Sequence, residues 1–256
     1  YTNISSSQPI YVRVEANAGA GCYIADVNPV FNLVVNHKAN ASGLTNLQTC
    51  DDDLDGFMTF DLEQQTTLVL GDQIDSDFTV TYHETQVDAD SGSNPLTSPF
   101  TNTIANQQTI FTRVEEIGLE ACYETTQFDV IVNPLPSTVT MTALSICDDD
   151  ADGLGLFTLT TKDTEALNGQ TGIAVSYHET QGDADTNTSP LASPYTNINA
   201  NSQIVIIRLE NTTTNCFSTM PLELRVNPLP IANAIGTQTI CDDDYDPPVK
   251  IIPLSN

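Results

Sequence analysis

The sequence of 256 residues contains no tryptophan, only three histidines, and only seven lysines and arginines. Against these few cationic side chains stand 34 Asp and Glu residues, so the formal net charge is −27 at pH 7. This charge repels nucleic-acid phosphates and anionic membrane surfaces, and we therefore expect no nucleic-acid partner. No run of the sequence approaches the roughly 18 apolar residues of a membrane span, which argues against membrane insertion.

The rest of the composition is that of a folded protein. Hydrophobic residues make up 39% of the chain and are distributed along it, so cores can form. The length alone predicts about two domains. Because the sequence begins with a tyrosine and carries no signal peptide, we expect it to be a mature or excised piece.

A pattern recurs about every 95 residues, which indicates a tandem array. Tyr-His-Glu-Thr occurs at 82–85 and again at 177–180, and Cys50, Cys147 and Cys241 lie 97 and 94 residues apart. A unit of this length suits a small independent domain rather than a solenoid repeat. We therefore predict the C-terminal part of a first repeat (1–36), two complete repeats (37–133 and 134–227) and the N-terminal part of a further repeat (228–256).

Within each repeat the pattern is that of an all-β domain. Apolar residues alternate with polar ones at 57–62, 78–82, 110–115 and 128–132, and at 157–160, 174–177, 204–209 and 222–226 in the next repeat. This predicts an Ig-like β-sandwich of about seven strands, with Tyr82 and Tyr177 in the place of the buried tryptophan. Helical candidates are confined to 62–70 and 164–167. The Pro-Leu-Pro segments between repeats favour stiff linkers and a rod-like array.

Acidic loops are the most specific chemical signal. Asp51, Asp53 and Asp55 are followed by Gly56, and the next repeat has the same spacing in Asp148, Asp150, Asp152 and Gly153. Alternate carboxylates on a tight loop can converge on Ca²⁺, which takes about six to eight oxygen ligands, and glycine permits the sharp turn. The alternative is a solvated acidic turn between two strands. A third loop, Asp242, Asp244 and Asp246, has proline in the glycine position and is a weaker match.

These loops are incomplete as EF-hands. Counting from the first aspartate, position 12 is Leu62 in one loop and Leu159 in the next, and neither supplies the bidentate carboxylate of an EF-hand. In an Ig-like topology the loops after the first and third strands lie at the same pole, which makes the acidic residues after Tyr-His-Glu-Thr candidates for the remaining ligands. These are Glu84, Asp88 and Asp90, with Glu179, Asp183 and Asp185 as counterparts. A polar turn is the alternative for this segment.

The few cationic groups suggest structural roles. His83 and His178 lie on the strand face opposite the core tyrosines, so we expect them in solvent, and no spacing of His or Cys fits a zinc site. Arginines 13, 113 and 208 recur at equivalent positions, each followed two residues later by Glu on the same face. They predict an ion pair or an anchor for an acidic loop.

Six cysteines fall at two fixed places in the repeat, one before the acidic loop and one at the start of the last strand. Their regularity predicts disulfides and hence an extracellular protein. The simplest scheme pairs Cys50 with Cys122 and Cys147 with Cys216, which leaves Cys22 and Cys241 with partners elsewhere. However, the first strand can end at the pole opposite to the start of the last strand. In that case bonds between adjacent domains are the alternative.

Taken together, these motifs resemble the tandem repeats of giant cell-surface proteins of Bacteroidota, especially flavobacteria. The resemblance rests on C-D-D-D-x-D-G, Y-H-E-T, S-P-Y/F-T-N, R-V/L-E, C-Y/F and V-N-P-L-P, and it covers nearly the whole chain. Relatives of this kind are adhesins with a gliding-motility-associated C-terminal domain, exported by type IX secretion. The resemblance implies an Ig-like stalk, calcium, and a surface or secreted location.

The sequence thus favours a non-enzymatic structural role, namely a calcium-stabilised stalk or fibre segment of an extracellular adhesin. The expected partners are neighbouring repeats, other copies in a fibre, and an adhesive ligand that the sequence does not identify. The alternative is a calcium-dependent glycan- or protein-binding module. No nucleophile–base set recurs with the repeat, so we expect no enzyme. Neither end of the sequence can bury a core alone, so the ends are completed either by neighbouring repeats in a longer chain or by other copies of a polymerising subunit. We expect a window on a longer chain, because the third strand, with its Tyr-His-Glu-Thr, is absent from both ends.

Overall fold

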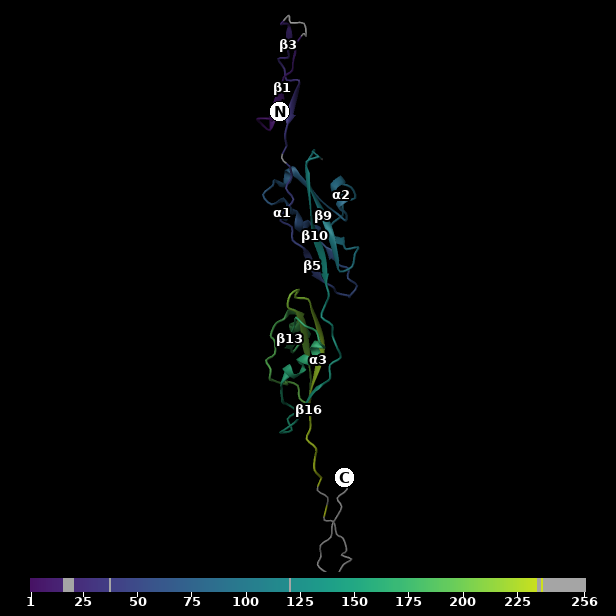
Figure 1. Ribbon diagram of the computed structural model, residues 1–256. Coiled ribbons are helices and arrows are strands. Elements are labelled where there is room, and N and C mark those ends of the chain that lie inside the picture. The colour runs from purple at the N-terminus through teal and green to yellow at the C-terminus, as the bar shows by residue number, and fades with distance from the viewer. Residues whose placement is uncertain (16–20, 37, 120, 234–235, 237–256) are drawn as a thin grey trace, which may run out of the picture. The chain divides into compact units, whose positions relative to one another are not determined.

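The computed structural model describes residues 1–15, 21–36, 38–119, 121–233 and 236 (Figure 1). In chain order these form a ribbon of short strands, the first complete repeat (37–133) and the second complete repeat (134–227). The further repeat expected at 228–256 lies almost wholly outside the described residues, and so do Cys241 and the third acidic loop. Within the described part, no helix is long and apolar enough to cross a membrane.

A four-stranded sheet forms one layer of the first repeat. Its strands are β5 (Leu47–Cys50), β10 (Tyr123–Asn133), β9 (Gln107–Glu116) and β7 (Phe78–His83), in that spatial order. β5 runs parallel to β10, and β9 is antiparallel to both of its neighbours. A small antiparallel sheet, β6 (Thr59–Phe60) with β8 (Phe100–Thr101), contributes to the same core. The repeat is therefore a β-sandwich, as the alternation of apolar residues predicted.

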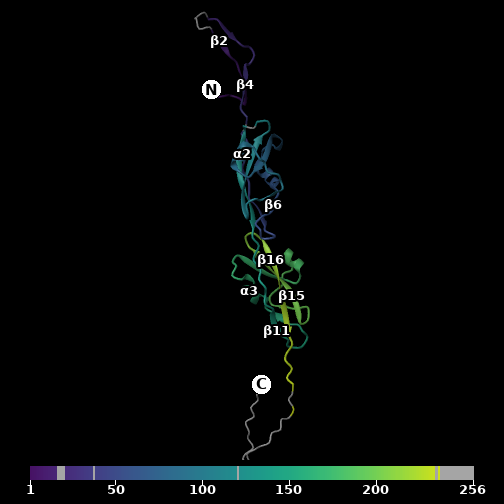
Figure 2. The same cartoon turned by 90° about the vertical axis from the view of Figure 1, so that its right-hand side faces the viewer.

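The second repeat has the same topology. Its main sheet has the order β11 (Leu144–Cys147), β16 (Phe217–Asn227), β15 (Ser202–Asn211) and β13 (Ile173–His178), with β11 parallel to β16. Figure 2 shows β11, β15 and β16 together in this repeat. The small sheet is β12 (Leu156–Phe157) with β14 (Tyr195–Thr196). The chain is thus a tandem of all-β sandwich domains.

Alternation with period two explains which side chains fill each core. In the first repeat the buried apolar cluster is Phe60, Leu62, Tyr82, Phe100, Ile110, Phe128, Val130 and Val132. Tyr82 occupies the predicted core position and meets Phe128 edge-on, with ring centroids 6.2 Å apart. Burial raises the pKa of Tyr82 to about 12, while the phenol keeps a hydrogen bond with the Thr66 hydroxyl at 2.8 Å. Tyr177 is buried at the equivalent place and donates to Asp163 at 2.6 Å.

Short helices complete each repeat. The predicted helical segments are present as η1 (Leu62–Gln65) with α1 (Thr66–Leu70), and as η3 (Leu159–Lys162) with α3 (Asp163–Leu167). The strand predicted at 157–160 is wrong beyond Phe157, because the chain turns into η3 there. A further turn, η2 (Asp75–Asp77), precedes β7. Two helices were not predicted, α2 (Gln86–Ser91) and α4 (Gln181–Thr186).

The N-terminal ribbon has the form of the last hairpin of a repeat. β1 (Ser7–Ile10) pairs with β4 (Phe31–Val34), and β2 (Arg13–Glu15) pairs with β3 (Tyr23–Ala25). In β2 and β3, Glu15 lies opposite Tyr23, just as Glu115 lies opposite Tyr123 in β9 and β10. Most of the apolar side chains of the ribbon are exposed.

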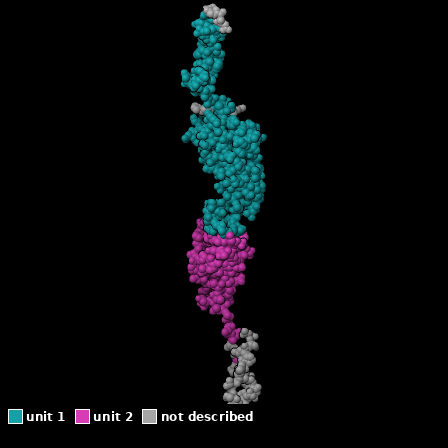
Figure 3. Space-filling model, viewed as in Figure 1, with its two compact units in different colours: residues 1–137, 170–174, 209–218 teal, residues 138–169, 175–208, 219–256 magenta. Residues whose placement is uncertain are grey.

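The chain divides into two compact units (Figure 3). Unit 1 contains residues 1–137, 170–174 and 209–218, and unit 2 contains 138–169, 175–208 and 219–256. The end of the β15–β16 hairpin, residues 209–218, therefore belongs to unit 1 although it comes from the second repeat. This assignment places Cys50 and Cys216 in the same unit.

Candidate functional site

The first acidic loop begins where β5 ends. Asp51 is only 4% exposed, and its backbone N–H continues the pairing of β5 by donating to the Asn133 carbonyl at 2.9 Å. Its two carboxylate oxygens accept from the backbone N–H groups of Leu54, at 2.8 Å, and Gly56, at 3.0 Å. The loop therefore folds around the first carboxylate of the motif.

The next two aspartates use the same kind of local hydrogen bond. Asp53 accepts from the backbone N–H of Asp55 at 3.2 Å, and Asp55 accepts from that of Phe57 at 2.7 Å. The second loop repeats this scheme residue for residue. Its carboxylates Asp148, Asp150 and Asp152 accept from backbone N–H groups two to five residues later in the chain. Because every bond runs from a carboxylate to a backbone N–H a few residues later, the loop is wound tightly.

Gly56 is required by this winding. Its φ is +81°, and a Cβ added there would lie 3.0 Å from the Cβ of Ala105 and 3.0 Å from Oδ1 of Asn106. Gly153 has a φ of +78° and equally close neighbours in the second repeat. The glycine of the motif is therefore fixed by both backbone conformation and crowding.

The winding brings the carboxylates together. One carboxylate oxygen from each of Asp51, Asp53 and Asp55 lies within 4.8 Å of the others, and the same holds for Asp148, Asp150 and Asp152. Two ligands on opposite sides of Ca²⁺ are at most about 5 Å apart, because each Ca–O bond is about 2.3–2.6 Å. The donor set is all oxygen and anionic, so its chemistry and spacing fit calcium. Backbone carbonyls and water are common sources of the remaining ligands of a calcium ion.

Crowding of the carboxylates shows in their acidity. The pKa of Asp53 is raised, first by desolvation and then by the negative charges of Asp55 and Asp52. For Asp150 the largest single influence is a backbone hydrogen bond from Asp152, which lowers the pKa. Desolvation and the charges of Asp152 and Asp149 together outweigh it, and the pKa is raised. In each loop the middle carboxylate therefore resists ionisation in the absence of a cation.

A buried asparagine secures each loop, and sequence reasoning did not assign it a role. Asn102 accepts from the backbone N–H of Met58 at 2.7 Å and donates to the carbonyls of Gly56, at 2.9 Å, and Ile104, at 2.8 Å. Asn197 makes the equivalent three bonds in the second repeat. The signal was available in the asparagine of the recurrent Ser-Pro-Phe/Tyr-Thr-Asn motif.

The second acidic segment does not join the loop carboxylates. Glu84 accepts from the Thr103 hydroxyl at 3.0 Å, Asp88 accepts from Asn94 at 2.8 Å, and Asp90 accepts from Gln86 at 2.7 Å. In the second repeat Glu179 accepts from Tyr195, Asp183 from Thr180 and Thr188, and Asp185 from Gln181. None of these six residues lies in a described carboxylate cluster.

Strand register gives the reason. β5 and β7 do point the same way, as expected, because both are parallel to β10. However, His83 at the end of β7 lies level with Gln127 of β10, whereas Cys50 at the end of β5 lies level with Asn133. A difference of six residues along a strand is roughly 20 Å. The segment after β7 therefore begins well short of the acidic loop.

The prediction that the two recurrent histidines lie in solvent is wrong. His83 and His178 are fully buried rather than in solvent. The ring of His83 bonds through Nδ1 to the Ser93 carbonyl at 2.7 Å and through Nε2 to the Thr81 hydroxyl at 2.9 Å. The carbonyl comes from the chain just after α2, which sequence reasoning did not predict. This segment covers the outer face of β7.

Arg113 forms the predicted ion pair, and it anchors the short helix α2 rather than an acidic loop. Its guanidinium donates to the carbonyls of Ala89 and Asp90, both at 3.0 Å, and pairs with Glu115 at 2.6 Å. Cations are favoured at helix C-termini, where carbonyls lack partners, and this is where Arg113 meets α2. Arg208 makes the same contacts with Ala184 and Asp185 in α4. Both arginines therefore hold a short helix against the sheet.

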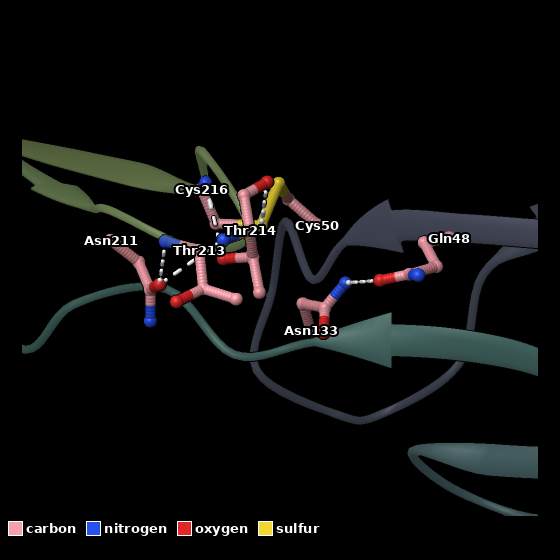
Figure 4. The surroundings of a disulfide bond; sticks show 7 residues. All are labelled: Gln48, Cys50, Asn133, Asn211, Thr213, Thr214 and Cys216. Atoms are coloured by element: carbon pink, nitrogen blue, oxygen red, sulfur yellow. Dashed lines mark hydrogen bonds between the residues drawn. A yellow bond between two sulfur atoms is a disulfide. The ribbon is translucent and has the colours of Figure 1, made fainter. Parts of the chain in front are cut away.

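The disulfide lies directly beside the first acidic loop. Cys50 is bonded to Cys216, with a Cα–Cα distance of 5.5 Å and a sequence separation of 166 residues. Figure 4 shows Cys216 at the end of a turn in which Asn211 accepts from the backbone N–H groups of Thr213, at 2.9 Å, and Thr214, at 3.1 Å. The bond therefore joins the first repeat to the second.

This connectivity overturns the simplest pairing scheme. Cys50 lies opposite Asn133 at the C-terminal end of β10, whereas Cys122 precedes the N-terminal end of that strand. The 11 residues of β10 separate them by roughly 36 Å, far beyond the roughly 7 Å that a disulfide spans. The same geometry separates Cys147 from Cys216. Cys147 and Cys22 are exposed and Cys122 is half-buried.

Comparison with known protein families gives one match. The model of the Flavobacterium inter-domain disulphide bond domain matches residues 46–136 and again residues 143–230. The two matches together cover more than two thirds of the chain. The chain belongs to this family. A bond between successive copies of the Flavobacterium inter-domain disulphide bond domain is what Cys50 and Cys216 form. Two such domains in tandem, linked by a disulfide, indicate an extracellular structural or adhesive module of a flavobacterial protein.

Other comparisons add little. No curated protein matches the chain. Among solved structures, human mucin-like protocadherin EC1-2 is 9% identical and covers 72% of this chain and 96% of its own, with a TM-score of 0.22. PcdhgB3 EC1-4 is 13% identical and covers 86% of this chain and 57% of its own, with a TM-score of 0.21. The endo-fucoidan hydrolase MfFcnA4 is 14% identical and covers 80% of this chain and 33% of its own, with a TM-score of 0.20. Overlaps this loose carry no argument about function.

Proposed function

We propose that the chain is a non-enzymatic segment of a calcium-stabilised stalk or fibre in a flavobacterial surface adhesin. The observation that carries this proposal is the pairing of two features at one place in the repeat. A disulfide to the next domain leaves from Cys50, and the acidic loop begins at the following residue. A covalent link and a cation-binding loop at the same point both serve to fix the chain there.

Calcium would be held by Asp51, Asp53 and Asp55 in one loop and by Asp148, Asp150 and Asp152 in the other. When bound, it supplies the positive charge that three converging carboxylates lack. Its binding would favour the ionised form of Asp53 and Asp150, whose pKa values are raised without it. No EF-hand glutamate closes either loop, so we expect weaker binding than in intracellular calcium buffers.

The non-enzymatic part of the proposal rests on how the repeated polar residues are used. His83 and Arg113, the recurrent residues best suited to chemistry, are buried and bond to the backbone around α2 and to the strand residues Thr81 and Glu115. Their counterparts His178 and Arg208 likewise bond to the backbone around α4, and His178 also bonds to Ser176. These contacts build the fold of the repeat.

The surface location, type IX export and adhesin role are inferences from the resemblance of the repeat motifs. Neighbouring repeats and other copies in a fibre are the proposed partners, together with an adhesive ligand. Protease treatment of intact cells tests the location directly, with an antibody against these repeats as the probe. Loss of the antigen without cell lysis supports a surface protein, whereas full protection of the antigen contradicts it.

Thermal unfolding with and without calcium tests the proposed role of the metal. At a calcium concentration 100 times Kd, each loop should stabilise its domain by about 2.7 kcal/mol relative to EDTA. The double variant Asp53→Asn and Asp150→Asn should lose this response. The variant Asp72→Asn, at an exposed carboxylate outside both loops, should keep it. Identical melting curves in calcium and EDTA for the unaltered chain would refute the calcium part of the proposal.

A further inference from the structure

The Cys50–Cys216 bond gives the chain a second covalent route. Along the backbone, 166 peptide steps separate the two cysteines, whereas through the disulfide their Cα atoms are 5.5 Å apart. The long route contains most of both sandwich domains, from the acidic loop after β5 to the turn before β16. The short route contains one S–S bond. A force applied to the two ends of the chain follows whichever route becomes taut first.

We propose that the disulfide transmits tension past residues 51–215, so that this part of both domains stays folded when the chain is pulled. The proposal goes beyond the proposed function, since it assigns a mechanical role to one bond. It depends on the connectivity of Cys50 and Cys216, and does not depend on calcium, on an adhesive ligand or on the export route.

The segments on either side of the disulfide are already extended. Tension from the N-terminal side enters through β5, a strand of 4 residues that ends at Cys50. Tension leaves through β16, a strand of 11 residues that begins just after Cys216. A strand in a sheet has a rise of about 3.3 Å per residue, close to the maximum length that the backbone allows. These two strands therefore gain almost no length when pulled, and the route through the disulfide has little slack.

Both attachment points are also held by hydrogen bonds. Beside Cys50, the backbone N–H of Asp51 donates to the carbonyl of Asn133 at 2.9 Å. At the other cysteine, the backbone N–H of Asn211 donates to the carbonyl of Cys216 at 2.8 Å, which closes the turn of residues 211–216. Neither cysteine sits on a long loop that would have to straighten before the bond becomes taut.

Removal of the disulfide changes the route of the force. Both domains then lie in series along the backbone, and each is held only by its noncovalent stability, typically about 5–15 kcal/mol. Complete extension of the 166 residues releases roughly 600 Å of chain, at about 3.6 Å per residue. A bond from Cys50 to Cys122 would instead hide 72 residues, or roughly 260 Å. The released length therefore reports which residues the disulfide protects.

Single-molecule force extension of the full chain, with handles at both ends and EDTA in the buffer, tests the proposal. We expect the oxidised chain to reach a fully stretched length about 600 Å shorter than the same chain after reduction. The variant Cys50→Ser should give the long length without reductant. The variant Cys147→Ser, which alters the equivalent cysteine of the second repeat, should behave like the unaltered chain.

Two results would overturn the proposal. An oxidised chain that extends to the same length as the reduced chain shows that no disulfide diverts the force. A difference of roughly 260 Å, or one of roughly 510 Å that Cys147→Ser halves, shows that the bonds lie within single repeats, and each domain is then stretched in turn. Because calcium is absent from the buffer, these outcomes are independent of the melting experiment on the acidic loops.

Discussion

Loss of the Cys50–Cys216 disulfide should destabilise the second repeat by about 4.5 kcal/mol. The magnitude follows from the length of loop that the bond closes. Cys50 lies opposite Asn133 in the folded first repeat, so unfolding of the second repeat alone frees the chain between Asn133 and Cys216. This loop has 216 − 133 = 83 residues. Chain entropy for a loop of that length corresponds to about 4.5 kcal/mol at 25 °C.

Urea denaturation of the double variant Cys50→Ser and Cys216→Ser measures this loss. With a slope of about 2 kcal/mol per molar, the midpoint for the second repeat should fall by about 2 M relative to the unaltered chain. The variant Cys147→Ser is the matched control, because it removes the equivalent exposed thiol and leaves the bond intact. A loss below about 1 kcal/mol, or an equal loss in the control, would refute the loop-closure reasoning.

Three further results are expected. First, in EDTA the loops should become more stable as the pH falls from 7 towards 4. The folded-state pKa values of Asp53 and Asp150 are raised, and a raised folded-state pKa gives stability that is present at low pH and lost as the pH rises. Asp53→Asn should weaken this trend, and an unchanged trend in the variant would contradict the reasoning. Second, Arg113→Lys should cost about 1.5–3 kcal/mol in thermal unfolding, because hydrogen bonds of a charged group to the end of α2 are lost. Arg13→Lys, where the arginine is 57% exposed, should cost far less, so equal losses would argue against the anchor. Third, Gly56→Ala should destabilise the first repeat by at least about 1 kcal/mol, since its φ is +81° and a Cβ meets Ala105; a neutral effect in urea denaturation would show that the loop is not tightly wound.

Much of the fold was predictable because the sequence repeats itself. Alternation with period two located the long strands, and the core positions of Tyr82 and Tyr177 followed from the same periodicity. The acidic loops were predictable because their hydrogen bonds are local, running from each aspartate to a backbone N–H two to five residues later. Spacing alone therefore fixes most of their geometry.

Features that depend on tertiary structure were not predictable. The helix α2 has only six residues, too few to show a helical period in the sequence. Its stability depends on tertiary contacts with Arg113 and with the face of β7 that it covers. His83 is buried for the same reason, because the chain after α2 covers it. The roles predicted for Glu84, Asp88 and Asp90 assumed that strands of equal direction also end at the same level in the sheet. However, β7 ends six residues along β10 before the level at which β5 ends.

The disulfide partner depended on which ends of the strands meet. The choice between the two schemes required knowing that β5 is parallel to β10, which places Cys50 at the far end of that strand from Cys122. Sequence spacing is the same for both schemes. Only the strand order and direction distinguish a bond within a repeat from a bond between repeats.

Calorimetric titration of calcium into the metal-free chain tests the proposed function most directly. The account predicts at least two binding events per chain, one for each loop that the structure describes. Asp53→Asn and Asp150→Asn should each remove one of them, and together should remove both. Absence of binding at millimolar calcium, or binding that survives the double variant, would contradict the assignment of these loops as calcium sites.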